Sequence, residues 1–227
     1  IISIAGGQVD DLLNGTVQIP TGSIEYFGAD GVLLDKSVGE FLQYASDAWA
    51  YAQKPFTYRS RDEFGYNHAI QSELFQTTDR AEFQNLVIKA AGSDNFSADS
   101  GIHMRDAYIQ HLSQTGGMEL DQRSWAPAVV YVNGNYWGLY DAREMVDDPN
   151  FTEHYYGKGL YDIDFNETTP GGTVAQFGSL NHWSTLFAFA ITQDMSVQSN
   201  YDYVDSLMNI PSFVDFIIIN SAVVNAG

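Results

Sequence analysis

The sequence of 227 residues contains no cysteine, which excludes disulfides, cysteine nucleophiles and thiolate metal sites. Lysine is scarce, with four in the whole chain, and 29 acidic residues against 10 basic residues give a formal net charge of −19. A chain this acidic repels phosphate backbones and anionic membranes, so nucleic acid and lipid are not expected as partners. No apolar run is long enough to cross a bilayer, so membrane insertion is not expected either.

The composition is that of a globular protein, with 44% hydrophobic and 14% aromatic residues. Residues 1–37 hold short apolar runs broken by glycine and by Pro20, a pattern typical of short strands and turns. This strand-rich segment would either extend a sheet or form the end of a preceding module. Residues 38–227 are predicted to form the main folded region.

The clearest local pattern in the chain is a β-hairpin between Ala128 and Asp148. Residues 129–132 form a β-branched and aromatic run, Asn133-Gly134 fits the two positive-φ positions of a type I′ turn, and Tyr136–Tyr140 returns as the second strand. The second strand runs directly into the polar pair Arg143-Glu144. Periodicity alone favours a surface hairpin with a charged exit, whereas a polar pair at the end of a buried strand is also typical of a functional site.

A second strand pattern follows Lys54, where Phe56 and Tyr58 alternate with Thr57 and Arg59. Lys54 has two interpretations, which the pattern alone leaves open. It is either a solvated edge lysine that discourages strand aggregation or a lysine that holds nucleotide phosphates, as a strand lysine does in protein kinases.

Further along, residues 85–89 are predicted to form a strand, and a helix is predicted from about Ser100 to Gln114 with Asp106 in its middle. Helices are also predicted over Asn181–Met195 and Tyr203–Val224. The run 216–219 would by itself favour a strand. The five histidines lack metal-ligand spacing, apart from His103 with His111, and are interpreted as ordinary polar positions.

Three segments together resemble the CotH kinase family, over roughly residues 39–227. They are the line Val130-Tyr-Val-Asn-Gly-Asn-Tyr-Trp-Gly-Leu-Tyr140 followed by Glu144, the segment Gln53–Gly65, and the pair Arg105-Asp106. The resemblance implies an α+β fold: a kinase-like small lobe, made of an antiparallel sheet plus a helix, followed by the first helices of a truncated large lobe. It also implies that residues 210–220 form the helix before the catalytic loop, so a helix and not a strand is predicted there.

The resemblance further implies a nucleotide site that uses ATP and Mg²⁺. By analogy with the order of elements in a protein kinase, Lys54 would hold phosphate, Asp106 would be its acidic partner, and Glu144 would lie near the ribose or base. The family's catalytic Asp and Asn would lie beyond Gly227, so no catalytic residue is named. The chain is therefore predicted to be a CotH-like region that is incomplete at its C-terminus.

Three hypotheses for function follow from these patterns. The first is part of a secreted bacterial kinase that transfers phosphate from ATP to serine on extracellular or coat proteins. The second is a non-catalytic extracellular or cell-surface assembly module, binding neighbouring subunits through a surface rich in acidic and aromatic residues. The third is a carbohydrate-binding module, based only on the fourteen Tyr and four Trp in the chain.

Overall fold

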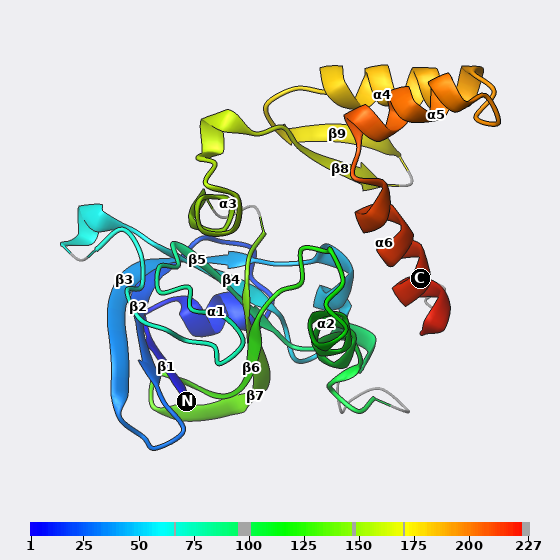
Figure 1. The fold of residues 1–227 in the computed structure, drawn as a ribbon. Helices are drawn as coiled ribbons and strands as arrows, with labels where there is room; N and C mark the ends of the chain where they lie inside the picture. Colours follow the sequence, from blue (N-terminus) through cyan, green and yellow to red (C-terminus); the bar gives the residue numbers. More distant parts are fainter. Residues whose placement is uncertain (66, 95–100, 147–148, 170, 224–227) are drawn as a thin grey trace.

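The computed structural model describes residues 1–65, 67–94, 101–146, 149–169 and 171–223, and its N-terminal part is a β-barrel (Figure 1). Seven strands of this described chain close the barrel in the order β1-β2-β3-β4-β5-β7-β6. Their bounds are Ile2–Ala5 (β1), Thr21–Phe27 (β2), Leu33–Gln43 (β3), Phe56–Ser60 (β4), Asn85–Lys89 (β5), Trp125–Val132 (β6) and Asn135–Glu144 (β7). Neighbouring strands run antiparallel, except that β1 and β6 close the barrel in parallel.

Three helices accompany the barrel, and a separate C-terminal part follows the third. The helices are α1 (Val9–Leu13), α2 (Arg105–Thr115) and α3 (Pro149–Tyr156), with 3-10 turns η1 (Ser46–Ala50), η2 (Asp62–Phe64), η3 (Gly92–Asp94) and η4 (Leu160–Asp162). The C-terminal part comprises the hairpin of β8 (Phe165–Thr169) and β9 (Gly172–Phe177), then α4 (Asn181–Thr192), α5 (Gln198–Leu207) and α6 (Ile210–Ala222).

Apolar side chains from all seven strands fill the barrel. On β4, Phe56 and Tyr58 share one face, as the sequence predicted, and both are fully buried among the core residues. Their rings contact Phe41 of β3 at centroid distances of 6.0 and 5.2 Å. The helix α1 and the loop between η2 and β5 add further apolar side chains to the same core: Val9, Leu12, Leu13, Ile70, Leu74, Phe75 and Phe83.

The hairpin that the sequence predicted is confirmed as β6 and β7. Asn133 and Gly134 both have positive φ, at 49° and 80°, which is the conformation that the type I′ turn requires. The two strands pair from Trp125 opposite Arg143 to Val132 opposite Asn135, with an irregular register between Val130 and Tyr131. This hairpin is long enough to span the barrel wall and to continue into the connection toward α3.

The prediction of a kinase-like small lobe, a sheet with a helix, was wrong. The strands close into a mixed barrel because β1 pairs with β6 in parallel, from Ile2 opposite Val130 to Ile4 opposite Val132. Residues 1–37 supply β1, β2 and the first part of β3, and the unbroken strand β3 runs through the position between residues 37 and 38. The N-terminal segment is therefore a structural part of the barrel wall.

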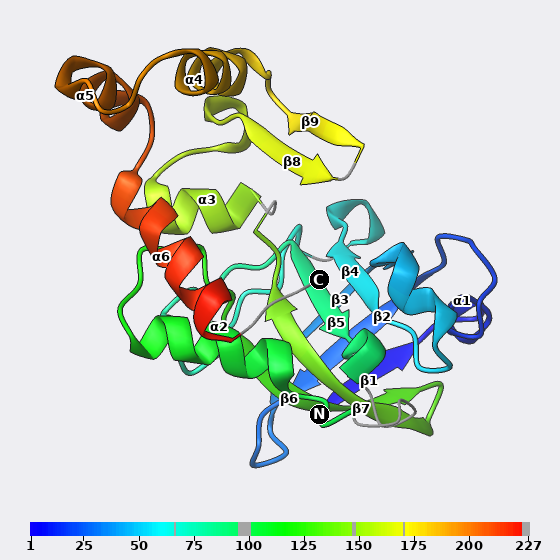
Figure 2. The same ribbon diagram turned by 90° about the vertical axis from the view of Figure 1, so that its right-hand side faces the viewer.

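The C-terminal part lies to one side of the barrel, with α3 between the two (Figure 2). Helix α6 descends toward α2, and Asp215 of α6 accepts a hydrogen bond of 2.8 Å from the amide of Glu119. Asn209 just before α6 donates a second bond, of 2.9 Å, to the Glu119 carboxylate. Within the described ranges, every helix is too short or too polar to span a membrane.

Candidate functional site

The predicted site residue Lys54 lies just before β4, and its ammonium group is hydrogen-bonded to the preceding turn. Its ammonium donates to the carbonyl oxygens of Trp49, at 3.1 Å, and Tyr51, at 2.9 Å. It also lies 5.7 Å from the ring centroid of Trp49. Lys54 therefore closes the turn around η1, and it does not pair with Asp106 as predicted.

A different lysine, Lys89, holds Asp106. The register of β5 and β7 places Lys89 directly opposite Asp141 and Val87 opposite Arg143, so the side chains of these polar residues share the outer face of the barrel. Helix α2 packs on this face and presents Asp106 from its first turn. Two strands and one helix thus bring together four charged residues from three separate parts of the sequence.

The four side chains form a continuous chain of ion pairs. Lys89 Nζ contacts Asp106 Oδ2, Arg143 Nη1 lies 2.6 Å from the same oxygen, and Arg143 Nη2 lies 3.3 Å from Asp141 Oδ2. The side chain of Arg143 is 2% exposed, whereas those of Lys89 and Asp106 are 26% and 43% exposed. We name Lys89, Asp106, Asp141 and Arg143 the ion-pair cluster. The buried residues Asp141 and Arg143 have a structural role, whereas the partly exposed Lys89 and Asp106 can contact a ligand.

Burial sets the direction of the pKa shifts in the cluster. Desolvation raises the pKa of Asp141, although the nearby charges of Arg143 and His103 oppose the shift. Desolvation also lowers the pKa of Arg143, and Asp141 opposes that shift. The two residues are buried together because each neutralises the other, which keeps the arginine fixed beneath Asp106.

Asp94 fixes the start of α2, and so the position of Asp106. Its carboxylate accepts backbone hydrogen bonds of 2.9–3.0 Å from Ile102, Met104 and Arg105, and it lies 3.1 Å from Nε of Arg105. Burial pushes the pKa of Asp94 upward, but these hydrogen bonds and the charge of Arg105 lower it overall. The predicted start of this helix, near Ser100, lies outside the described residues, and α2 begins at Arg105.

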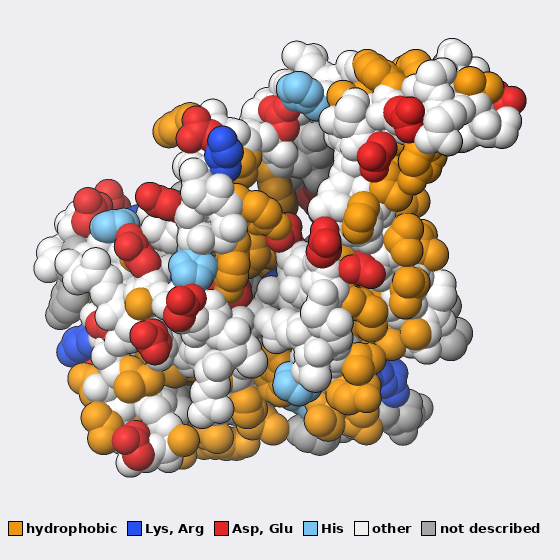
Figure 3. Space-filling model, viewed as in Figure 1, with side chains coloured by type: hydrophobic (Ala, Val, Ile, Leu, Met, Phe, Trp, Pro, Cys, Tyr) orange, Lys and Arg blue, Asp and Glu red, His pale blue; other side chains and the backbone are white. Residues whose placement is uncertain are grey.

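A cleft separates the barrel from the β8–β9 hairpin. A cavity of about 400 Å³ is lined on the barrel side by Tyr44, Arg123, Met145 and Val146, and on the hairpin side by Phe165, Asn166, Glu167 and Gln176. A second cavity of about 360 Å³ shares Val146 and Phe165 and extends toward α3. Figure 3 shows the hollow between the barrel and the C-terminal part. Arg123 donates a hydrogen bond of 3.2 Å to Tyr44 Oη. Burial is the main cause that lowers the pKa of Arg143, Asp141 raises it, and the positive charge of the nearby Arg123 lowers it further.

Glu144, the third predicted site residue, is enclosed by protein atoms. It is 0% exposed, and its carboxylate lies 3.0 Å from Nη1 of Arg80. It also accepts hydrogen bonds from the amide of Ser124, at 2.8 Å, and from the hydroxyl of Tyr155 on α3. This Arg80–Glu144 latch joins the end of β7 to α3, and the Glu144 carboxylate is held by these protein partners.

Lys89 and Arg80 were not predicted from the sequence, whereas Arg143 belongs to the polar pair predicted at the end of the hairpin. The signal for Lys89 was present, since it ends a predicted strand and precedes the predicted helix that carries Asp106. Arg80 lies in an irregular loop between the rings of Phe83 and Phe151, at 4.5 and 5.6 Å from their centroids, and no local pattern marks it.

Comparison with known protein families shows the family of this chain. A family model described as CotH kinase protein matches residues 47–226, which is most of the chain. The chain belongs to the CotH kinase family. No curated protein sequence matches it. The family match covers β4 to β7, and therefore all four members of the ion-pair cluster and the latch residues Arg80 and Glu144.

The donor set of this CotH-family protein fits a phosphate better than a metal ion. Lys89, at the exposed end of the ion-pair cluster, and Arg123, in the lining of the cleft, are cations that can meet phosphate oxygens. Among the described residues, no group of three or more His, Asp or Glu side chains is placed to hold a metal ion. We therefore assign no step to Mg²⁺ from these residues.

Proposed function

We propose that this CotH-family protein binds ATP in the cleft beside the ion-pair cluster and takes part in phosphate transfer to serine on proteins outside the cell. The observation that carries the proposal is the contact of Lys89 with Asp106, whose carboxylate also contacts the buried Arg143. A strand lysine held by an acidic residue of the next helix is the arrangement that protein kinases use to hold nucleotide phosphates. Family membership supports the same chemistry.

Each residue of the cluster has a separate task in this proposal. Lys89 donates to phosphate oxygens, Asp106 sets the direction of its ammonium group, and Arg143 keeps Asp106 in place. Met145 and Val146 give the cleft an apolar wall beside the end of β7, which suits a purine ring. When bound, ATP would supply the phosphoryl group, and Mg²⁺ would offset the negative charge of its phosphates.

The two lysines near β4 and β5 provide a matched test. Fluorescent ATP is titrated, with Mg²⁺, into the wild-type chain, into Lys89→Met and into Lys54→Ala. We expect Lys89→Met to bind about ten- to hundredfold more weakly, since a hydrogen bond to a charged group contributes roughly 1.5–3 kcal/mol. Lys54→Ala should bind as the wild type does, because its ammonium group is held by two carbonyl oxygens.

Transfer itself is measured with radiolabelled ATP and a serine-containing protein, followed by phosphoamino-acid analysis. We expect labelled phosphoserine with the wild type and its loss with Lys89→Met. Equal nucleotide binding by all three chains would contradict the role of Lys89. Absence of nucleotide binding by the wild type would contradict the whole proposal.

A second candidate function is non-catalytic assembly with neighbouring extracellular subunits. It is favoured by the apolar side chains exposed along α4 and α6, which Figure 3 shows beside the cleft: Phe187, Ile191, Phe213, Val214, Phe216, Ile217 and Ile218. Sedimentation at increasing protein concentration, with and without Phe216→Glu, distinguishes the two functions. Association that this substitution abolishes, without nucleotide binding, would favour assembly.

A further inference from the structure

The β8–β9 hairpin turns more of its side chains toward the cleft than a regular strand would. Phe165, Asn166 and Glu167 are consecutive on β8, yet all three line the cavity of about 400 Å³. In a regular strand, successive side chains point to opposite faces. The pairing of β8 with β9 shifts between Phe165 and Asn166, because Gln176 of β9 has no residue opposite it. Such a bulge re-aims side chains, and here it accounts for Asn166 in the cleft lining.

The side-chain amide of Asn166 has an oxygen without a partner. This oxygen is buried, and it makes no hydrogen bond with any described residue. Other polar groups of the lining are paired, since Gln176 donates to Glu167 at 2.5 Å and Arg123 donates to Tyr44 at 3.2 Å. A buried acceptor without a donor is unfavourable, and a ligand that donates to it removes this cost. The amide of Asn166 therefore favours a ligand with a hydrogen-bond donor.

The barrel side of the same cavity is different in character. Met145 and Val146, which follow β7, form an apolar wall, and Arg123 adds a positive charge. Met145 is two residues from Arg143, so this wall adjoins the ion-pair cluster in the sequence. An apolar wall across from a single amide suits a planar ring with a donor and an acceptor on one edge.

We propose that Asn166 determines the base specificity of the nucleotide site by pairing with the N6 and N7 edge of adenine. The inference rests on the proposed function and names the base that the site selects. The adenine amino group would donate to the Asn166 oxygen, and the Asn166 amide nitrogen would donate to N7, with the ring against Met145 and Val146. Guanine has acceptors at both positions, so its O6 would face the Asn166 oxygen. Adenine nucleotides are therefore favoured over guanine nucleotides.

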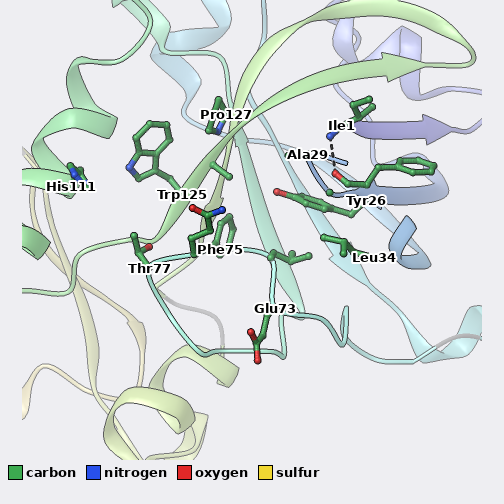
Figure 4. Close-up of a pocket in the computed structure, with 15 residues that line it drawn as sticks. Ile1, Tyr26, Ala29, Leu34, Glu73, Phe75, Thr77, His111, Trp125 and Pro127 are labelled. Atoms are coloured by element: carbon green, nitrogen blue, oxygen red, sulfur yellow. Dashed lines mark hydrogen bonds between the residues drawn. The ribbon is translucent and has the colours of Figure 1, made fainter. Parts of the chain in front are cut away.

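A larger cavity elsewhere on the barrel does not offer these groups. It has a volume of about 570 Å³ and lies between the β2–β3 hairpin, residues 73–77 and the start of β6 (Figure 4). Its walls are mostly apolar, with Phe75 and Trp125 among them, and its described lining residues include no lysine or arginine. It shares no described lining residue with the cleft. The negatively charged nucleotide is therefore assigned to the cleft.

The test measures competition of three nucleotides with ribose-labelled fluorescent ATP, in the presence of Mg²⁺. The competitors are ATP, GTP and 7-deaza-ATP, which lacks only the N7 acceptor. We expect the wild type to bind ATP about five- to hundredfold more tightly than GTP, the range for one bidentate pair. It should bind 7-deaza-ATP about two- to tenfold more weakly than ATP, the range for one neutral hydrogen bond.

Two variants of β8 separate base recognition from support of the hairpin. Asn166→Leu removes the amide at similar side-chain volume, whereas Thr168→Val changes a polar residue of the same strand that does not line the cleft. Asn166→Leu should bind all three nucleotides with equal affinity, and Thr168→Val should keep the wild-type order. The wild-type comparison needs no variant, so it refutes or supports the inference even where Asn166→Leu does not fold.

Three outcomes would overturn the inference. Equal binding of ATP with GTP or with 7-deaza-ATP by the wild type would exclude recognition of the N6 and N7 edge, while the role of Lys89 would stand. Retention of the wild-type order by Asn166→Leu would limit Asn166 to a structural role. Absence of binding of every nucleotide to the wild type would contradict the proposed function together with this inference.

Discussion

Replacing Glu144 by alanine should destabilise the folded chain by about 3–5 kcal/mol, the usual cost of removing one partner from a buried ion pair. Glu144 is 0% exposed and Arg80 is 1% exposed, with 3.0 Å between them. In the variant, the buried guanidinium group would lose its contact with the Glu144 carboxylate, and the amide of Ser124 would lose its acceptor. The cost comes from the groups that are left behind, not from the net strength of the pair.

Two further variants separate this explanation from a general loss of charge. The exposed pair of Lys36 and Glu25 has a 3.3 Å contact and side chains 44% and 33% exposed, so Glu25→Ala should cost less than about 1 kcal/mol. The double variant Arg80→Met with Glu144→Leu replaces both charges by apolar groups. It should recover much of the stability that Glu144→Ala loses.

The measurement is urea unfolding followed by far-ultraviolet circular dichroism and by tryptophan fluorescence. Agreement of the two transitions supports a two-state fit, and an unchanged slope shows that the variants differ in stability alone. A loss for Glu144→Ala within about 1 kcal/mol of that for Glu25→Ala would refute the reasoning. It would mean that the latch is open to water in solution.

Two other substitutions test the supports of the site and of the barrel, and a third serves as a control. Because the pKa of Asp94 is lowered in the fold, its contribution is present above its ordinary pKa of 3.8 and is lost as the pH falls through the lower folded value. Asp94→Asn should therefore lower the urea midpoint at neutral pH and flatten its decline in acid. A Cβ at Gly39 of β3 would overlap the carbonyl oxygen of Arg59 on β4, so Gly39→Ala should cost about 1–3 kcal/mol. Gly7→Ala, where nothing lies within 4 Å of the added atom, should leave the midpoint nearly unchanged.

The parts of the fold that the sequence predicted well are those that local patterns determine. The type I′ turn at Asn133-Gly134 requires two positive φ angles, and few other dipeptides accept them as readily. The run 216–219, which alone favoured a strand, lies inside α6 as the family resemblance implied. Closure of the barrel has no such local signal, since it depends on a parallel contact between residues 2–4 and residues 130–132.

The prediction that Lys54 pairs with Asp106 was wrong for a similar reason, because this contact also depends on which strands are neighbours. Lys54 precedes a strand and resembles a phosphate-binding lysine in its local sequence, but the carbonyl groups of residues 49 and 51 already surround its ammonium group. Lys89 is in contact with Asp106 only because β5 lies next to β7 in the barrel and α2 packs over both strands. Such a neighbour relation follows from strand order, which residue spacing does not encode. The ion-pair cluster is therefore a consequence of the closed barrel, and substitutions that disturb the pairing of β5 with β7 should impair the cluster even when all four charged residues remain.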